Sequence, residues 1–179
     1  MSGTAVGGWG TGPPIDFLLV TTGTTGFDDL VVAAEAVTTR LDVRDGLIQF
    51  GEGSRIPTGL PALRHVPALD PYYEKASVVV AHGGAGTAME VLRRGLPLVA
   101  AANGDRYDGH QEDLLSALDA AGHLVWCRDL DRLDHAIVRA LTVPLRPLPP
   151  ERCSIPADVE RILATLPARR RLRWPWRGR

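Results

Sequence analysis

From Ile15 onward the sequence alternates short apolar β-rich runs with amphipathic stretches, and glycine, aspartate or proline marks each switch. This alternation predicts an α/β domain built on a parallel sheet. Several of the runs are continuously apolar, which indicates helices on both faces of the sheet. The expected strands cover residues 15–21, 47–50, 63–66, 77–81, 96–100 and 124–127.

The amphipathic stretches predict helices, and glycine or proline follows several of their expected ends. Gly95 with Pro97 ends one helix, and Gly122 ends another. A proline-rich connector over residues 144–156 precedes the last helix. The expected helices cover residues 27–41, a short turn around 70–75, and residues 87–94, 110–121, 130–141 and 157–166.

The composition is that of a globular protein, with 45% hydrophobic residues and a formal net charge of -1, and it gives no sign of nucleic-acid binding. We expect residues 1–14 to be a disordered glycine-rich leader, residues 15–166 to be one domain, and residues 167–179 to be a separate basic tail. No apolar run reaches the length of about 20 residues needed to span a bilayer. Cys127 and Cys153 have no metal-ligand spacing and are expected to be reduced thiols.

The segment 77–95 is the most informative part of the chain, because a buried strand runs directly into a glycine-rich turn and a helix. Gly83, Gly84 and Gly86 allow a ligand to approach the backbone, and free N–H groups at the helix start near Thr87 suit a diphosphate. The same glycines also fit a simple tight turn. The segment lacks the GK[ST] of a P-loop and the G-x-G-x-x-G spacing of a dinucleotide fingerprint.

A second glycine loop, GTTG from Gly23, follows the first strand. With the first loop it would lie at the carboxyl ends of parallel strands, where open α/β sheets bind ligands, and Gly23 and Thr24 are therefore candidate binding residues. Asp28 and Asp29 are explained by the dipole of the helix that they begin.

Two further residues near the first glycine turn each allow two interpretations. Glu90 completes a capping box with Thr87, or its carboxylate binds both hydroxyls of a ribose. His82, at the exit of a buried strand, orients the glycine turn by a hydrogen bond or touches the ligand.

The stretch from Asn103 to Glu112 links a strand to the next helix. Asp108 and Gln111 have the spacing of an N-cap pair. Alternatively, His110 and Gln111 place two polar side chains at a helix start that faces the same crevice, which makes them candidate binding residues together with Asn103.

These motifs resemble the carboxy-terminal domain of family 28 glycosyltransferases over roughly residues 15–141. They are similar above all to small stand-alone versions: the soluble subunit of two-subunit UDP-N-acetylglucosamine transferases and exopolysaccharide relatives of the PssE type. The resemblance is carried by residues 103–111 and by VTTGTTGFDDL from Val20, IQFGEGSRIP from Ile48 and AHGGAGTAMEVLRRGLPLV from Ala81.

The resemblance implies a Rossmann-like donor-binding half of a GT-B fold, with a UDP-sugar as donor substrate. Glu90 would hold the ribose, and the diphosphate would lie between the Gly23–Thr24 loop and the loop from Gly83 to Thr87. His110 and Gln111 would face the donor sugar. Ala102 and Gly109 stand where the family usually has proline and asparagine, so the resemblance does not identify the sugar.

A GT-B enzyme has two such domains, and this chain has room for one. The resemblance therefore implies a membrane-attached subunit that binds a lipid-linked acceptor and carries the general base, with His110 as the alternative base. It also implies inverting transfer without a metal cofactor, at a cytoplasmic site peripheral to the inner face of the membrane. A non-catalytic nucleotide-binding regulatory module is the alternative function, and a dinucleotide-dependent enzyme fits the motifs less well.

The basic tail carries six arginines between Arg169 and Arg179, interleaved with Leu172, Trp174 and Trp176. A solvated, disordered tail is one interpretation. Binding to an anionic membrane surface is the other, because arginine and tryptophan both suit the headgroup region.

Overall fold

The computed structural model describes residues 12–104 and 110–148 of the 179-residue chain. Most of the predicted leader, the predicted helix at 157–166 and the basic tail lie outside the described residues. None of the described helices is long and apolar enough to cross a membrane.

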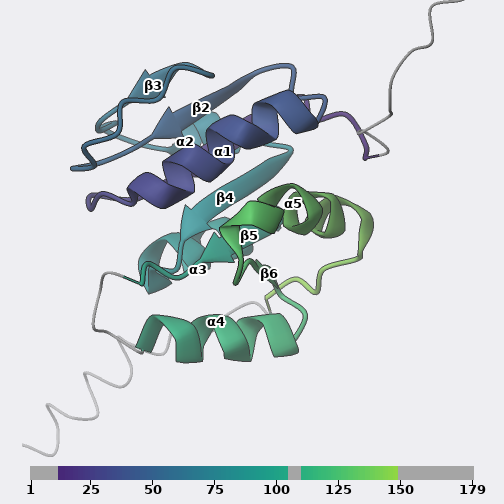
Figure 1. The fold of residues 1–179 in the computed structure, drawn as a ribbon. Helices are drawn as coiled ribbons and strands as arrows, with labels where there is room; N and C mark the ends of the chain where they lie inside the picture. Colours follow the sequence, from purple (N-terminus) through teal and green to yellow (C-terminus); the bar gives the residue numbers. More distant parts are fainter. Residues whose placement is uncertain (1–11, 105–109, 149–179) are drawn as a thin grey trace, which may run out of the picture. The chain divides into compact units, whose positions relative to one another are not determined.

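The described part of the chain contains one six-stranded sheet, and every pair of neighbouring strands in it is parallel. Its strand order is β3-β2-β1-β4-β5-β6 (Figure 1). Each predicted strand overlaps an observed one, and most observed strands are shorter than expected. The observed strands are β1 (Leu18–Thr21), β2 (Gly46–Gln49), β3 (Ala62–Leu63), β4 (Val78–His82), β5 (Leu98–Ala101) and β6 (Val125–Trp126). The strand predicted over 63–66 shares only Leu63 with β3.

The predicted helices within the described residues are also present. They are α1 (Asp28–Arg40), α2 (Asp70–Tyr73), α3 (Ala85–Arg93), α4 (His110–Ala120) and α5 (Leu133–Thr142). The helix predicted over 130–141 is divided, because a 3-10 turn, η1 (Leu130–Arg132), precedes α5. The side chain of Asp129 caps this turn by accepting a hydrogen bond from the Asp131 N–H.

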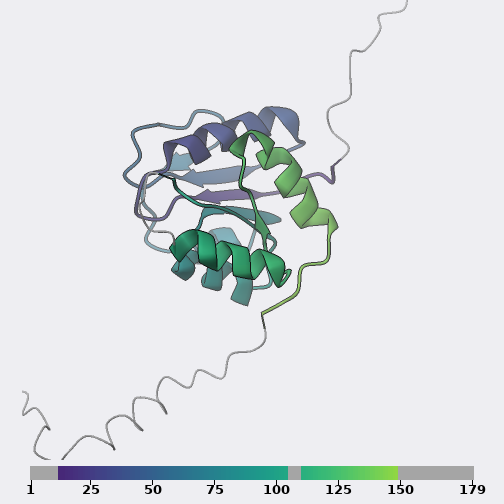
Figure 2. The same cartoon turned by 60° about the horizontal axis from the view of Figure 1, so that its bottom comes forward.

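Strand residues alternate between two hydrophobic cores, one on each face of the sheet. Val78 and Val80 pack in the core that contains the buried residues of α1 and α5. Val79 and Ala81 pack in the core that contains those of α2, α3 and α4. Figures 1 and 2 show the two helix layers on opposite sides of the sheet. The prediction of helices on both faces is confirmed.

The chain changes direction across the sheet between β1 and β4. From β1 it proceeds through α1 to β2, whereas from β4 it proceeds through α3 to β5 on the other side. Because β1 and β4 are themselves neighbours, the loops that follow them leave the sheet in opposite directions. A crevice at such a switch point is the usual ligand site of an open α/β sheet.

Helix α1 offers a matched test of this packing. Leu30 is fully buried, whereas Val32 on the same helix is 49% exposed. We expect Leu30→Ala to lower the free energy of unfolding by about 2–5 kcal/mol, because it removes buried apolar contacts and leaves a cavity. Val32→Ala should change it by less than about 0.5 kcal/mol. Urea denaturation measures both, and equal losses would contradict the described orientation of α1.

Candidate functional site

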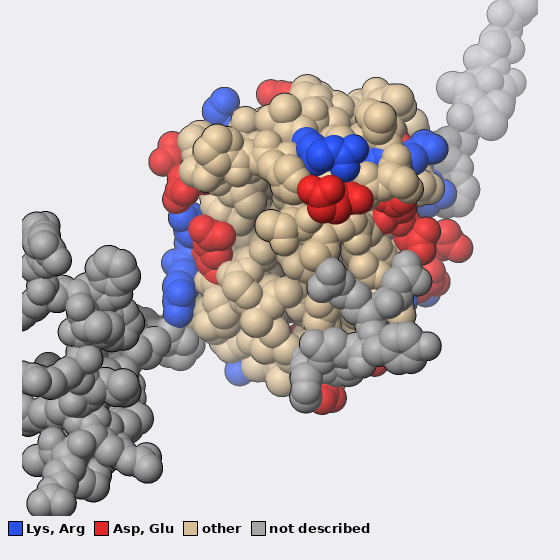
Figure 3. Space-filling model, turned by 90° about the vertical axis from the view of Figure 1, so that its left-hand side faces the viewer, with Lys and Arg blue, Asp and Glu red and all other residues tan. Residues whose placement is uncertain are grey.

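The candidate residues lie at the end of the sheet where the parallel strands finish. Gly23 and Thr24 follow β1, His82 is the last residue of β4, and Asn103 follows β5. The structure therefore brings together residues that are far apart in the sequence. Figure 3 shows this end of the molecule, where neutral residues form much of the surface between the charged side chains.

The imidazole of His82 lies between two glycines. A Cβ atom at Gly23 would lie 2.5 Å from His82 Cε1, and a Cβ atom at Gly84 would collide with His82 Nε2. Gly23 also has a positive φ of 69°, which favours glycine. Gly84 has an ordinary φ of -70°, so it is the ring of His82 that requires a glycine there. The imidazole of His82 therefore fills the space between the loop that contains Gly23 and the loop that contains Gly84, and its size sets their separation.

The carbonyl of His82 also shapes the second loop, because it accepts a hydrogen bond of 2.8 Å from the Gly84 N–H. This hydrogen bond is made by the main chain, and it does not decide between the two interpretations of the His82 side chain. Asn103 joins a third loop to the first, since its Nδ2 donates to the Gly26 carbonyl at 3.2 Å.

Helix α3 begins two residues earlier than predicted, and the capping-box interpretation of Thr87 and Glu90 is wrong. The N-cap is Gly84, which forms no side-chain cap. The Ala88 N–H donates to the Gly84 carbonyl, so the N–H groups of Ala85, Gly86 and Thr87 precede the first bond within the helix. Backbone donors of this kind attract an anion.

Gly86 marks open space in front of these donors. A Cβ atom added there would meet no atom of the described residues within 4 Å, in contrast to Gly23 and Gly84. Gly86 is also exposed. Packing within the described residues therefore does not require a glycine at this position. Close approach of a ligand to the backbone at the start of the helix would require one.

Glu90 lies in the second turn of α3 rather than the first, and its side chain is 43% exposed. Tyr73 donates its hydroxyl to Glu90 Oε2 at 3.3 Å, and Arg94 Nη1 lies 3.7 Å from Oε1. Burial raises the pKa of Tyr73, and the negative charge of Glu90 raises it further. The tyrosine therefore remains a hydroxyl donor, and the carboxylate of Glu90 is oriented while still accessible.

Gln49 is a site residue that the sequence interpretation missed. Its buried side chain donates from Nε2 to the carbonyls of Gly23 at 2.7 Å and Arg64 at 2.8 Å. Its Oε1 accepts a hydrogen bond from the Thr21 hydroxyl. One amide thus fixes the loop after β1. A glutamine within the apolar run of residues 47–50 is the signal that identifies it, because a buried amide needs partners.

Asp28 does more than complement the dipole of α1. Its carboxylate accepts hydrogen bonds from the hydroxyl and N–H of Ser54 and from the N–H of Arg55. The bond from the Ser54 hydroxyl is the largest cause of the lowered pKa of Asp28. The explanation by the helix dipole alone is therefore incomplete, because Asp28 also holds the loop after β2 beside the start of α1.

The remaining candidate residues lie at the start of α4. This helix begins at His110, close to the prediction. Gln111 Oε1 is buried and has no hydrogen-bond donor within residues 12–104 and 110–148. The predicted N-cap residue Asp108 and the side chain of His110 lie outside the described residues.

Two glycine substitutions on one helix start separate packing from open space. We expect Gly84→Ala to lower the free energy of unfolding by about 1–3 kcal/mol, because the new methyl group displaces the His82 ring. Gly86→Ala should leave stability unchanged or raise it by up to about 1 kcal/mol, because alanine restricts the unfolded chain more than glycine. Thermal and urea unfolding compare the variants. A stable Gly84→Ala protein would contradict the described position of the imidazole.

Comparison with known proteins adds evidence on the family. Residues 17–166 match the model of the glycosyltransferase family 28 C-terminal domain. The human protein "UDP-N-acetylglucosamine transferase subunit ALG13" (Homo sapiens) is 33% identical over 122 residues, which cover 62% of this chain and 11% of the human protein. The chain thus spans about a tenth of that relative.

Solved structures share the fold. MurG from Acinetobacter baumannii has a TM-score of 0.59 at 16% identity, over 85% of this chain and 50% of that chain. The NMR structure of ALG13 has a TM-score of 0.51 at 18% identity, over 84% of this chain and 95% of that chain. With its Rossmann-like parallel sheet and the family match over most of its length, the chain belongs to the glycosyltransferase family 28 C-terminal domain.

Proposed function

We propose that this chain binds a UDP-sugar at the switch point between β1 and β4, as the donor-binding subunit of a two-component inverting glycosyltransferase. Membership of glycosyltransferase family 28 supports the reaction class. The names of the ALG13 relatives support a UDP-N-acetylglucosamine transferase subunit. The observation that carries the proposal is the open space over Gly86, which lies beside free helix N–H groups.

The diphosphate of the donor is proposed to lie between the Gly23–Thr24 loop and the start of α3. The N–H groups of Ala85, Gly86 and Thr87 supply hydrogen bonds, and the positive end of the helix dipole supplies electrostatic attraction. Gly83 is buried, and a Cβ atom there would press on the side chain of Leu115, so its small size serves packing.

The ribose is proposed to bind Glu90. A carboxylate that accepts hydrogen bonds from two neighbouring hydroxyls recognises a ribose and discriminates against a deoxyribose. Tyr73 of α2 and Arg94 at the end of α3 hold this carboxylate, and its exposed part remains for the ligand. Gln111, His110 and Asn103 are proposed to lie near the donor sugar. Gln111 would supply a hydrogen-bond acceptor.

In the proposed reaction an acceptor hydroxyl attacks C1 of the donor sugar, and the bond between C1 and the diphosphate oxygen breaks. The hydroxyl proton passes to a general base on the acceptor subunit or to His110. The departing UDP gains negative charge, which the N–H groups at the start of α3 stabilise without a metal ion. The acceptor is proposed to be lipid-linked, in glycan or surface polysaccharide assembly, and held by a membrane-attached subunit.

Titration calorimetry with UDP and 2′-deoxy-UDP tests the ribose contact. We expect the wild-type chain to bind UDP about tenfold or more tightly than 2′-deoxy-UDP, because the deoxy compound lacks a hydrogen bond to a charged group. Glu90→Ala should weaken UDP binding and abolish this preference. NADH serves as the control ligand for a dinucleotide site. If Glu90→Ala keeps the preference, Glu90 does not bind the ribose.

Gly86→Ala tests the diphosphate contact separately from the fold. Because a methyl group at this position meets open space, the variant should fold normally and yet bind UDP at least tenfold more weakly. Uridine, which has no phosphate, is the matched ligand and should lose no affinity. Unchanged affinity for UDP in a folded Gly86→Ala protein would place the diphosphate elsewhere.

Transfer itself requires the proposed acceptor subunit. We expect radiolabelled N-acetylglucosamine to pass from UDP to lipid when the purified chain is added to membranes of cells that lack it but keep the acceptor subunit. The Glu90→Ala chain should lose this transfer because it cannot position the donor. If Glu90→Ala binds no UDP and still supports full transfer, the chain is a regulatory module rather than a donor-binding subunit.

A further inference from the structure

A groove lies along β6, the last strand in the sheet order, away from the proposed donor site. Its lining comes from β6 and the residues just after it, from Arg132 of η1, from α5, and from Asp119 of α4. We call it the basic groove and define it by Trp126, Arg128, Arg132, Ala136 and Arg139.

Three arginines line the basic groove, together with two aspartates, Asp119 and Asp129. Arg128 stacks on the ring of Trp126, 4.0 Å from the ring centroid. Arg128, Arg132 and Arg139 are exposed, and within residues 12–104 and 110–148 none of them has a carboxylate within ion-pair distance. These arginines call for an anionic ligand.

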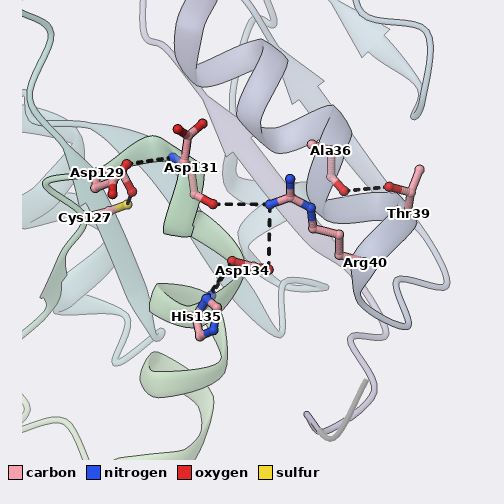
Figure 4. Close-up of polar contacts among 8 residues, drawn as sticks. All are labelled: Ala36, Thr39, Arg40, Cys127, Asp129, Asp131, Asp134 and His135. Atoms are coloured by element: carbon pink, nitrogen blue, oxygen red, sulfur yellow. Dashed lines mark hydrogen bonds and ion pairs between the residues drawn. The ribbon is translucent and has the colours of Figure 1, made fainter. Parts of the chain in front are cut away.

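The acidic side chains nearby are engaged elsewhere. Asp134 contacts Arg40 of α1 at 3.8 Å and accepts the His135 N–H at 2.8 Å (Figure 4). Asp129 caps η1, and Asp119 accepts the main-chain N–H of Trp126 at 3.2 Å. Asp129 and Asp119 both line the groove, but each already holds a main-chain donor. The arginines thus keep their hydrogen-bonding capacity for a partner.

We propose that the basic groove binds an extended acidic segment of a partner protein. Arg132 and Arg139 are seven residues apart, which corresponds to about 10 Å along a helix. Carboxylates two and four residues apart lie on one face of an extended chain, about 7 and 13 Å apart, so such a chain can present a separate carboxylate to each arginine. The ring of Trp126 and the side chain of Ala136 supply apolar contacts between the charges.

The segment binds through its side chains rather than as a seventh strand. Asp119 already occupies the N–H of Trp126 on β6, so this donor is not available for strand pairing. The basic tail of this chain, with arginines from Arg169 to Arg179, has the same charge as the groove and does not suit it. A partner protein with an acidic segment is therefore the occupant with complementary charge.

A labelled octapeptide of alternating glutamate and valine is a suitable probe, and the full-length chain is the binding partner. We expect fluorescence anisotropy to show binding that weakens between 50 and about 300 mM salt. Arg132→Gln/Arg139→Gln should bind at least tenfold more weakly. Arg44→Gln/Arg146→Gln removes the same net charge outside the groove and should bind like the wild type.

Three results would overturn the proposal: equal binding of the glutamine–valine peptide, equal weakening by the control pair of substitutions, or no peptide binding at all. Binding to phosphatidylserine vesicles tests whether a membrane occupies the groove instead. If Arg132→Gln/Arg139→Gln loses vesicle binding but keeps peptide binding, the proposal is also overturned. UDP titration of the same variant should give wild-type affinity, so failure of this proposal and failure of the donor site are distinguishable.

Discussion

Burial of both faces of the parallel sheet is the constraint on which the rest of this molecule depends. Because α1 and α5 cover one face and α2, α3 and α4 cover the other, a ligand can reach the sheet only at its ends and edges. At the carboxyl end, the reversal between β1 and β4 sends two loops apart. The proposed donor site follows from this topology before any side chain is considered.

Side chains then fix the distance between these loops. His82 fills the space between Gly23 and Gly84, and Gln49 ties the Gly23 carbonyl to the neighbouring strands. Asn103 connects the first loop to the chain that follows β5. These contacts are uncharged or involve the backbone, so the loops are positioned without placing a cation in the crevice. A diphosphate would meet preorganised N–H groups there.

The sequence was sufficient to predict the six strands and the helices between them, because a sheet covered on both faces requires apolar runs that are visible locally. The start of α3 was misplaced, since Gly84 caps the helix with its backbone and no side chain signals it. The roles of Gln49 and Asp28 were missed for another reason. Their partners are 15 to 28 residues away in the chain, and only the folded sheet brings them together.

Two kinds of anion recognition result from two different arrangements of donors. At the start of α3, N–H groups converge on one small volume, which suits a compact group with concentrated charge such as a diphosphate. Beside β6, Arg128 follows the strand, Arg132 ends η1 and Arg139 lies on α5, a spread that suits an extended chain with separated charges. β5 lies between β4 and β6, so the two surfaces are separate parts of the sheet. The proposed nucleotide would therefore lie at the carboxyl end of the sheet, and the proposed protein segment would lie beside its outer strand.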